Sequence, residues 1–311
     1  MRIAFIGYGE AARAFTDSLA RKPGVDVIAA HDIRQDDSMA SAATSRGLRF
    51  EPEIGQAISG ADWIISAVTA DRSLEAARSA ADHLRQGQLF IDINSVSPGR
   101  KQQAALLVTA RNAGYLDMAV MAPVHPRGHA TPVLLAGPSD DALRADFEAL
   151  GFTFEIVGDE VGAATAIKMV RSMFVKGLEA LTVETLMAAA TAGCFDKIVN
   201  SLAETFPGLG WPDNARYMFE RTLRHGARRA AEMRESAVTY DELGFVGALA
   251  GRIADVQGKM GALAAGELPA GPLEKAIAHI ASLRRKEAKA TGAVAGTDAP
   301  ARASNPTPIT P

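Results

Sequence analysis

Short runs of apolar residues alternate with longer amphipathic stretches through the first half of the chain. Each run is continuous, which is typical of parallel strands buried on both faces. Helical stretches at residues 10–21, 71–84 and 100–113 supply the crossovers that parallel strands require. The pattern therefore predicts an α/β fold with a doubly wound parallel sheet. The expected strands lie at residues 3–6, 25–30, 63–68, 89–93, 116–120, 132–136 and 152–157, with a helix at 140–150 before the last of them.

The pattern changes after residue 157. A single helical pattern persists over residues 162–190, and apolar residues on several of its faces predict a helix buried between two domains. Helical periodicity without a convincing strand continues to about residue 285. The positions that recur at steps of three or four along the first of these helices are Ile167, Val170, Phe174, Leu178 and Leu181.

Three regions follow from these patterns. Residues 1–160 form the doubly wound domain, and residues 161–286 form an all-helical domain for substrate binding and dimerisation. Residues 287–311 consist largely of Ala, Gly, Thr, Ser and Pro. A segment with so few large apolar residues cannot offset the entropy of ordering, so a disordered tail is predicted there.

Composition excludes several classes of protein. The net charge is -3 and the sequence pI about 6.1, which argues against a dedicated nucleic-acid binder. No apolar stretch reaches the ~18 residues that a bilayer-spanning helix needs. The single cysteine, Cys194, rules out an internal disulfide framework and suits a reducing compartment. We therefore expect a cytoplasmic protein, and no His/Cys/Asp/Glu spacing suggests a metal site.

The first expected strand runs into a G-x-G-x-x-A pattern that opens a helix. Gly7 permits the tight turn, and Gly9 lets a pyrophosphate approach the backbone. Ala12 permits close packing of helix on strand, while the amides of Glu10, Ala11 and Ala12 face the phosphates at the positive end of the helix. This Rossmann-type context predicts a dinucleotide site, although a glycine turn without a ligand is the alternative.

Asp32 ends the second expected strand, where a carboxylate can accept hydrogen bonds from an adenosine ribose. It would also repel a 2'-phosphate, which favours NAD over NADP. Arg34 lies two residues on and could reverse that preference by pairing with the phosphate. The alternative role for Asp32 is to cap the helical region at residues 36–46.

Two further loops follow strands of the expected sheet. Val68 and Thr69 lie at the end of the third strand, and Asn94 and Ser95 follow the fourth. Ligands of open α/β sheets bind beyond the carboxyl ends of the strands, so these loops are expected to line the nicotinamide side. Capping by Ser97 ahead of a proline explains the end of the second loop, but it does not explain Asn94.

These segments resemble the superfamily of 6-phosphogluconate dehydrogenase and 3-hydroxyisobutyrate dehydrogenase, the β-hydroxyacid dehydrogenases. The likeness covers about the first 190 residues. The C-terminal part resembles an uncharacterised phosphogluconate-dehydrogenase-like branch with a domain of unknown function. The motifs that carry the resemblance are the G-x-G-x-x-A turn, IDINSVSP at 91–98, APV at 122–124 and GAATAIK at 162–168.

The resemblance implies that Lys168 is the catalytic lysine. Its surroundings in the sequence point the same way, because an apolar helix start would desolvate the amine and depress its pKa, and Arg171 is a like charge one turn on. A lysine so lowered can exchange a hydroxyl proton near neutral pH. A lysine that extends from the helix surface is the alternative. The family has Asn where this chain has Ser172, which can still hydrogen-bond a substrate oxygen.

The expected substrate loop departs from the family pattern Ala-Pro-Val-Ser-Gly-Gly. Here Val124 is followed by His125, Pro126 and Arg127. The small residues whose backbone amides would bind a carboxylate are therefore replaced, and Arg127 could bind an anion with its side chain instead. In the helical domain, a loose alignment puts His225 where the family has a Lys-Asp pair. His225 belongs to a basic stripe with Arg221, Arg224 and Arg228, which recur at steps of three or four residues, and the stripe faces either an anionic substrate or solvent.

The interpretation favoured is an NAD(P)-dependent oxidoreductase. It would transfer a hydride between nicotinamide and a hydroxy acid or related alcohol, in a cleft between the two domains. Lys168 would be the general acid/base, with Ser172 and Asn94 orienting the reacting oxygen. An imine reductase on the same architecture and a non-catalytic dinucleotide-binding module are the alternatives. The resemblance also implies a homodimer. The cationic residues of the substrate loop and the basic stripe favour a small, anionic substrate, and the charge and the short apolar stretches argue against nucleic acid and membrane as partners.

Overall fold

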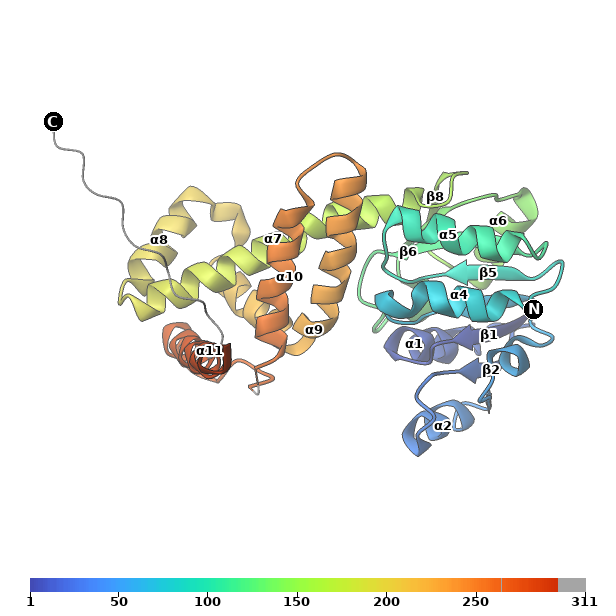
Figure 1. Cartoon of the computed structure of the whole chain (residues 1–311), viewed down its shortest axis with the longest axis horizontal. Helices are drawn as coiled ribbons and strands as arrows, with labels where there is room; N and C mark the ends of the chain where they lie inside the picture. Colours follow the sequence, from blue (N-terminus) through green and yellow to red (C-terminus); the bar gives the residue numbers. More distant parts are fainter. Residues whose placement is uncertain (264, 296–311) are drawn as a thin grey trace. The chain divides into compact units, whose positions relative to one another are not determined.

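The computed structural model describes residues 1–263 and 265–295 and contains two compact units (Figure 1). The first unit comprises residues 1–178 and 228–256. The second comprises the described residues of 179–227 and 257–295. Each unit combines separate stretches of chain because three long helices contribute residues to both. The limits of the units therefore do not coincide with the predicted domain boundary after residue 160.

An eight-stranded sheet forms the centre of the first unit, in the order β3-β2-β1-β4-β5-β6-β7-β8. The strand order reverses between β1 and β4, which is the topological switch point of doubly wound folds. The predicted α/β class and all seven predicted strands are confirmed, and β3 is an additional short edge strand. The strands are β1 (Arg2–Ile6), β2 (Asp26–His31), β3 (Arg49–Phe50), β4 (Trp63–Ser66), β5 (Leu89–Asp92), β6 (Gly114–Val120), β7 (Val133–Ala136) and β8 (Phe154–Gly158).

One strand corrects the prediction of a fully parallel sheet. β7 runs antiparallel to β6 and parallel to β8, whereas the other pairs are parallel. The chain between β6 and β7 contains only the 3-10 turn η2 (Gly128–Ala130) and no crossover helix. A return over so short a connection produces antiparallel pairing.

Alternate residues of the strands support helices on both faces of this sheet. Ile3 and Phe5 of β1 pack with α1, α2 and α6, whereas Ala4 and Ile6 pack with α3, α4 and α5. Figure 1 shows α4 and α5 lying over the strands. The period of two follows from the pleat, and both sets are buried because each face is covered. These helices are α1 (Glu10–Leu19), α2 (Asp37–Thr44), α3 (Ile54–Ile58), α4 (Ser73–Ala81), α5 (Pro98–Thr109) and α6 (Asp141–Leu150), with the 3-10 turn η1 (Ala70–Arg72) before α4.

Beyond residue 161 the described chain is helical, as predicted. In the second unit, two helices cross closely at Gly226 and Gly261, since a Cβ at Gly226 would lie 2.2 Å from the carbonyl oxygen of Gln257. The glycines are therefore required by this approach of two backbones. The helices are α7 (Ala163–Thr191), α8 (Phe195–Thr205), α9 (Asp213–Glu242), α10 (Gly247–Gly261) and α11 (Leu273–Ala295), with the 3-10 turn η3 (Pro207–Leu209).

Two predictions for the C-terminal half need correction. α7 is not buried all round in the single chain, because Phe174 is 74% and Leu181 69% exposed, and Ile167 and Val170 are exposed as well. Helix α11 extends to Ala295, so the tail predicted for residues 287–311 is wrong for 287–295, where Ala, Glu and Lys favour helix. Residues 296–311 lie outside the described part of the chain.

None of the helices in the described part of the chain combines the length and hydrophobicity of a bilayer-spanning segment. The same residues contain no cluster of three or more His, Cys, Asp or Glu side chains suited to a metal ion.

Candidate dinucleotide and proton-transfer site

The glycine turn lies at the switch point of the sheet, between the ends of β1 and β4. Gly7 has a φ of 84°, and a Cβ there would lie 2.5 Å from the carbonyl oxygen of Ala67. Beside Gly9, by contrast, a Cβ would meet no described atom within 4 Å, and no described side chain caps the start of α1. A pyrophosphate fits this open backbone, where the amides of Glu10, Ala11 and Ala12 form the first turn of α1.

Replacement of Gly7 by alanine tests the close approach at this turn. The Gly24→Ala variant is the matched control, because Gly24 has a similar φ of 75° but nothing within 4 Å of a Cβ. In both variants an alanine has to adopt a positive φ, which is strained. Only the methyl group at position 7 also collides with neighbouring backbone atoms. We expect Gly7→Ala to lower the free energy of unfolding by at least about 1 kcal/mol more than Gly24→Ala does. Urea unfolding measures this difference, and equal losses would contradict it.

Asp32 joins the end of β2 to the glycine turn. Its Oδ2 accepts from the Tyr8 amide at 2.7 Å and its Oδ1 from the Arg34 amide at 2.9 Å. The helix that follows is capped instead by Asp36, which accepts from the Met39 amide. The alternative role of Asp32 as a helix cap is therefore wrong. The exposed guanidinium of Arg34 pairs with Asp36 at 2.9 Å.

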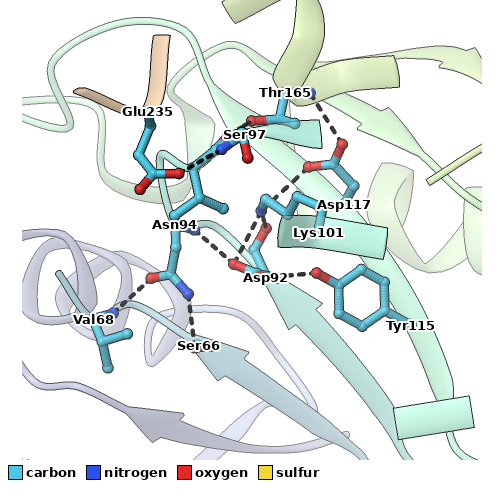
Figure 2. Close-up of polar contacts among 11 residues, drawn as sticks. Ser66, Val68, Asp92, Asn94, Ser97, Lys101, Tyr115, Asp117, Thr165 and Glu235 are labelled. Atoms are coloured by element: carbon cyan, nitrogen blue, oxygen red, sulfur yellow. Dashed lines mark hydrogen bonds and ion pairs between the residues drawn. The ribbon is translucent and has the colours of Figure 1, made fainter. Parts of the chain in front are cut away.

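Asn94 links the two loops that follow β4 and β5 (Figure 2). Its Oδ1 accepts from the Val68 amide at 2.7 Å, and its Nδ2 donates to Ser66 Oγ at 3.0 Å. The side chain is buried, and its carbonyl oxygen and amide nitrogen each have a partner in the protein. Thr69 is exposed and Ser95 half-buried. The predicted contact of Asn94 with a reacting oxygen stays a prediction.

Ser97 caps α5 ahead of Pro98, as predicted, by accepting from the Arg100 amide. A carboxylate from α9, Glu235, reaches the same helix start. It accepts from the Ser97 amide at 2.9 Å and pairs with Arg100 at 3.0 Å. Figure 2 shows Glu235 directed at Ser97. The sequence analysis missed this contact because the two residues are far apart in the chain.

Lys168 is half-buried in the first third of α7. Burial lowers the pKa of its amine, the carboxylate of Glu232 raises it, and the charges of Lys176, Lys101 and Arg228 lower it further, to about 8. The lowered pKa of Lys168 agrees with the expectation. The positive charges that lower it do not include Arg171, which is exposed one turn further along α7.

Glu232 on α9 is the acidic group of this region, and the sequence analysis did not single it out. Its Oε2 lies 2.8 Å from Lys176 Nζ, and its Oε1 lies 3.5 Å from Arg228. Burial raises the pKa of Glu232, but the charges of Lys176, Lys168 and Arg228 outweigh burial and hold the pKa at about 2. Glu232 is therefore ionised beside Lys168 at any physiological pH.

Ser172 is buried on α7, one turn from Lys168. Its Oγ accepts from Lys176 Nζ at 3.1 Å, so the two lysines and the serine form one polar face with Glu232. The predicted role of Ser172 in orienting a substrate oxygen stays a prediction.

The predicted substrate loop packs against α1. Val124 is buried in the core, and its carbonyl accepts from the Gly128 amide. His125 and Arg127 are exposed. β6, which leads into the loop, is parallel to β5, so the loop starts at the same edge of the sheet as Asn94. A role for these residues in anion binding stays a prediction.

His225 lies on α9 in the second unit. The neighbouring arginines of the predicted basic stripe are ion-paired there. Arg224 contacts Glu267 at 2.9 Å, and Arg221 lies 3.6 Å from Glu179. These pairs favour the interpretation of the stripe as a charge-balanced face.

The glycine turn, the carboxylate after β2 and the strand order together define a Rossmann-type dinucleotide-binding protein. The sequence pattern of the NAD-binding domain of 6-phosphogluconate dehydrogenase matches residues 2–161, and a domain of unknown function, DUF1932, matches residues 189–260. The chain belongs to the 6-phosphogluconate dehydrogenase-like family of NAD-binding proteins. This confirms the resemblance, including the branch with the uncharacterised C-terminal domain.

Three solved structures illustrate the likeness. A conserved hypothetical protein from Sinorhizobium meliloti is 33% identical, with a TM-score of 0.71 over 91% of this chain and 96% of that one. The 3-hydroxyisobutyrate dehydrogenase of Mycobacterium tuberculosis, solved with L-serine, is 18% identical, with a TM-score of 0.68 over 92% and 98%. An imine reductase from Streptomyces aurantiacus is 18% identical, with a TM-score of 0.53 over 90% and 99%. The last two share the fold.

Proposed function

We propose that this protein is an NAD-dependent oxidoreductase that acts on a hydroxy acid, with Lys168 as its general acid/base. A lysine whose pKa is lowered to about 8, in a protein of an NAD-binding dehydrogenase-like family, is the observation that carries the proposal. In the oxidation direction, the neutral amine of Lys168 accepts the hydroxyl proton of the substrate. The bound nicotinamide dinucleotide supplies the hydride acceptor.

The remaining residues receive roles that follow from their positions. Ser172, at the i+4 spacing from Lys168, orients the same oxygen, and Asn94 fixes the two loops on the nicotinamide side. His125 and Arg127 are proposed to bind the anionic group of the substrate. A homodimer is the proposed assembly, and the exposed apolar side chains on α7, such as Phe174, support it.

A substrate panel tests the reaction class. The hydroxy acids are 3-hydroxyisobutyrate and L-serine, each with NAD and with NADP, and the reductive arm uses cyclic imines with NADH and with NADPH. Oxidation of a hydroxy acid is the expected result. Turnover of the imines alone would favour the imine reductase instead, and binding of NADH without any turnover would favour a non-catalytic module.

The Asp32→Asn variant tests the preference for NAD. Its amide oxygen can still accept from the Tyr8 amide, but the negative charge that would repel a 2'-phosphate is gone. We expect the affinity for NADPH relative to NADH to rise about tenfold, which corresponds to about 1.4 kcal/mol. Fluorescence titration with both cofactors measures the ratio.

Asp26→Asn is the control, since Asp26 is an exposed carboxylate at the opposite end of the same strand. Its cofactor ratio is expected to match that of the wild type. Tighter binding of NADPH than NADH by the wild type would contradict the assignment of Asp32.

A further inference from the structure

Three charged side chains are buried together behind the loop that carries Asn94 (Figure 2). Lys101 of α5 and Asp117 of β6 are 0% exposed, and Asp92 of β5 is 1% exposed. Lys101 Nζ lies 3.0 Å from Asp92 Oδ1 and 3.2 Å from Asp117 Oδ1, and it donates to the carbonyl oxygen of Asp92 at 2.5 Å. We call these three residues the buried ionic cluster.

Stability alone does not account for the cluster. Removing charges from water is expensive, and replacing a buried ion group by well-packed apolar residues is often neutral or stabilising. A buried ion group can instead fix one arrangement of the elements that carry it.

Each carboxylate of the cluster holds a different segment of the candidate site. Asp92 Oδ1 accepts from the Asn94 amide at 2.8 Å, while its Oδ2 accepts from Tyr115 Oη at 2.7 Å. Asp117 Oδ2 accepts from the Thr165 amide at 3.0 Å, in the first turn of α7. α7 carries Lys168 less than one turn further on. One ammonium group thus joins the loop of Asn94 to the helix of Lys168.

A second contact joins the same two segments. Thr165 Oγ1 donates to the carbonyl oxygen of Val96 at 2.7 Å. Thr165 at the start of α7 is therefore held twice. Its backbone amide is bound by Asp117 of the buried ionic cluster, and its side chain binds the loop of Asn94 directly. Both contacts lie within the first unit.

We propose that Lys101 is a positioning residue that fixes the start of the Lys168 helix against the loop of Asn94. The proposal rests on the proposed function, because it assigns Lys101 the alignment of the residues named there. A displacement of about 1 Å at a reacting group can lower a rate about a hundredfold, so such alignment is of consequence for turnover.

The Lys101→Met/Asp117→Asn double variant removes the ionic connection. It takes away one positive and one negative charge, so the net charge of the cluster stays the same. The amide oxygen at position 117 can still accept from the Thr165 amide, and Asp92 keeps its contacts with Asn94 and Tyr115. Phe147→Leu is the control, since it weakens the core of the same unit at a buried ring that packs on Trp63 and Phe152.

Hydrogen exchange measured by mass spectrometry tests directly whether Lys101 holds the loop of Asn94 and the start of α7 together. In the double variant we expect exchange in residues 92–97 and 163–168 to accelerate about tenfold, while β1 keeps its wild-type rates. For the same variant we expect kcat with 3-hydroxyisobutyrate and NAD to fall about a hundredfold. The Kd for NADH is expected to change far less, because the predicted contacts of its pyrophosphate and ribose are at the glycine turn and Asp32. Wild-type exchange in both segments, or acceleration throughout the sheet as in Phe147→Leu, would overturn the proposal.

Two designs keep the test decisive. If the double variant does not fold, Asp117→Asn alone is used, and exchange is then expected to rise in 163–168 but not in 92–97, where Lys101 still holds Asp92. Unchanged exchange in 163–168 overturns the proposal. If the wild type oxidises neither 3-hydroxyisobutyrate nor L-serine, that result counts against the proposed function, and hydrogen exchange still decides whether Lys101 joins the two segments.

Discussion

Replacement of Lys168 by alanine is expected to lower kcat for hydroxy-acid oxidation by about 10²–10⁴-fold. This is the range that general acid–base catalysis contributes, and the methyl group left in place of the amine cannot accept a proton. The Kd for NADH is expected to stay near the wild-type value, because Lys168 is not among the residues predicted to bind the dinucleotide. Steady-state turnover and fluorescence titration of the same preparation measure the two effects.

The pH dependence of the wild type supplies a second sign of the same role. Burial and neighbouring positive charges bring the pKa of Lys168 to about 8, and only the neutral amine can accept the hydroxyl proton. Oxidation should therefore increase as the pH rises through about 8 and level off above it. Reduction, which needs the protonated amine, should decline over the same interval.

Arg171→Ala is the matched control for the loss of a cation from α7. Arg171 is exposed, and it is not among the charges that shift the pKa of Lys168. Its turnover and pH profile are expected to match the wild type. Turnover of Lys168→Ala within about tenfold of the wild type would remove the general acid/base from the proposal.

Local patterns are sufficient to predict most of the first unit. The strands, the glycine turn and the cap at Ser97 depend on residues close together in the chain, whose periodicity and turn chemistry can be identified directly. The direction of β7 was predicted wrongly. The connection at residues 121–132 contains no helix that could serve as a parallel crossover, so the chain returns antiparallel to β6.

The candidate site likewise contains residues that local sequence indicates and residues that only the packing of helices brings together. Lys168 and Asp32 are indicated by their immediate neighbours, whereas Glu232 and Lys176 meet only because α7 and α9 pack together. Arg171 lies close to Lys168 in the sequence, but its side chain is exposed and its charge is not among those that shift the pKa of Lys168.

One overlooked residue did leave a signal in the sequence. Lys101 precedes Ala104, Ala105 and Val108 at helical spacing, so it occupies the apolar face of α5. A lysine on such a face requires a buried anion. The buried aspartates of two neighbouring strands are the candidates, and they are the partners that Lys101 has.

The Glu232→Gln variant is expected to lose about 3–5 kcal/mol of unfolding free energy at pH 7. It removes the carboxylate that lies 2.8 Å from the buried ammonium of Lys176, and breaking a buried pair on one side is strongly destabilising. The pKa of Glu232 is held at about 2 in the folded protein, against 4.5 when unperturbed. A depressed pKa contributes stability that is complete above about pH 4.5 and is lost as the pH falls towards 2, and here it amounts to about 3 kcal/mol. Urea unfolding of both proteins at several pH values should therefore show a difference that narrows as the pH falls through this interval.

The same variant should also move the pH profile of oxidation. The Glu232 carboxylate raises the pKa of Lys168, so its removal lets that pKa fall below about 8 and shifts the rising limb of the profile to lower pH. Glu242→Gln, at an exposed position on the same helix, removes an equal charge and is expected to change neither stability nor profile. A profile of Glu232→Gln that shifts to higher pH would show that Glu232 does not act on Lys168 as a nearby anion. An unchanged pH profile together with the loss of stability would show that Glu232 stabilises the fold through its ion pair with Lys176 and does not influence Lys168.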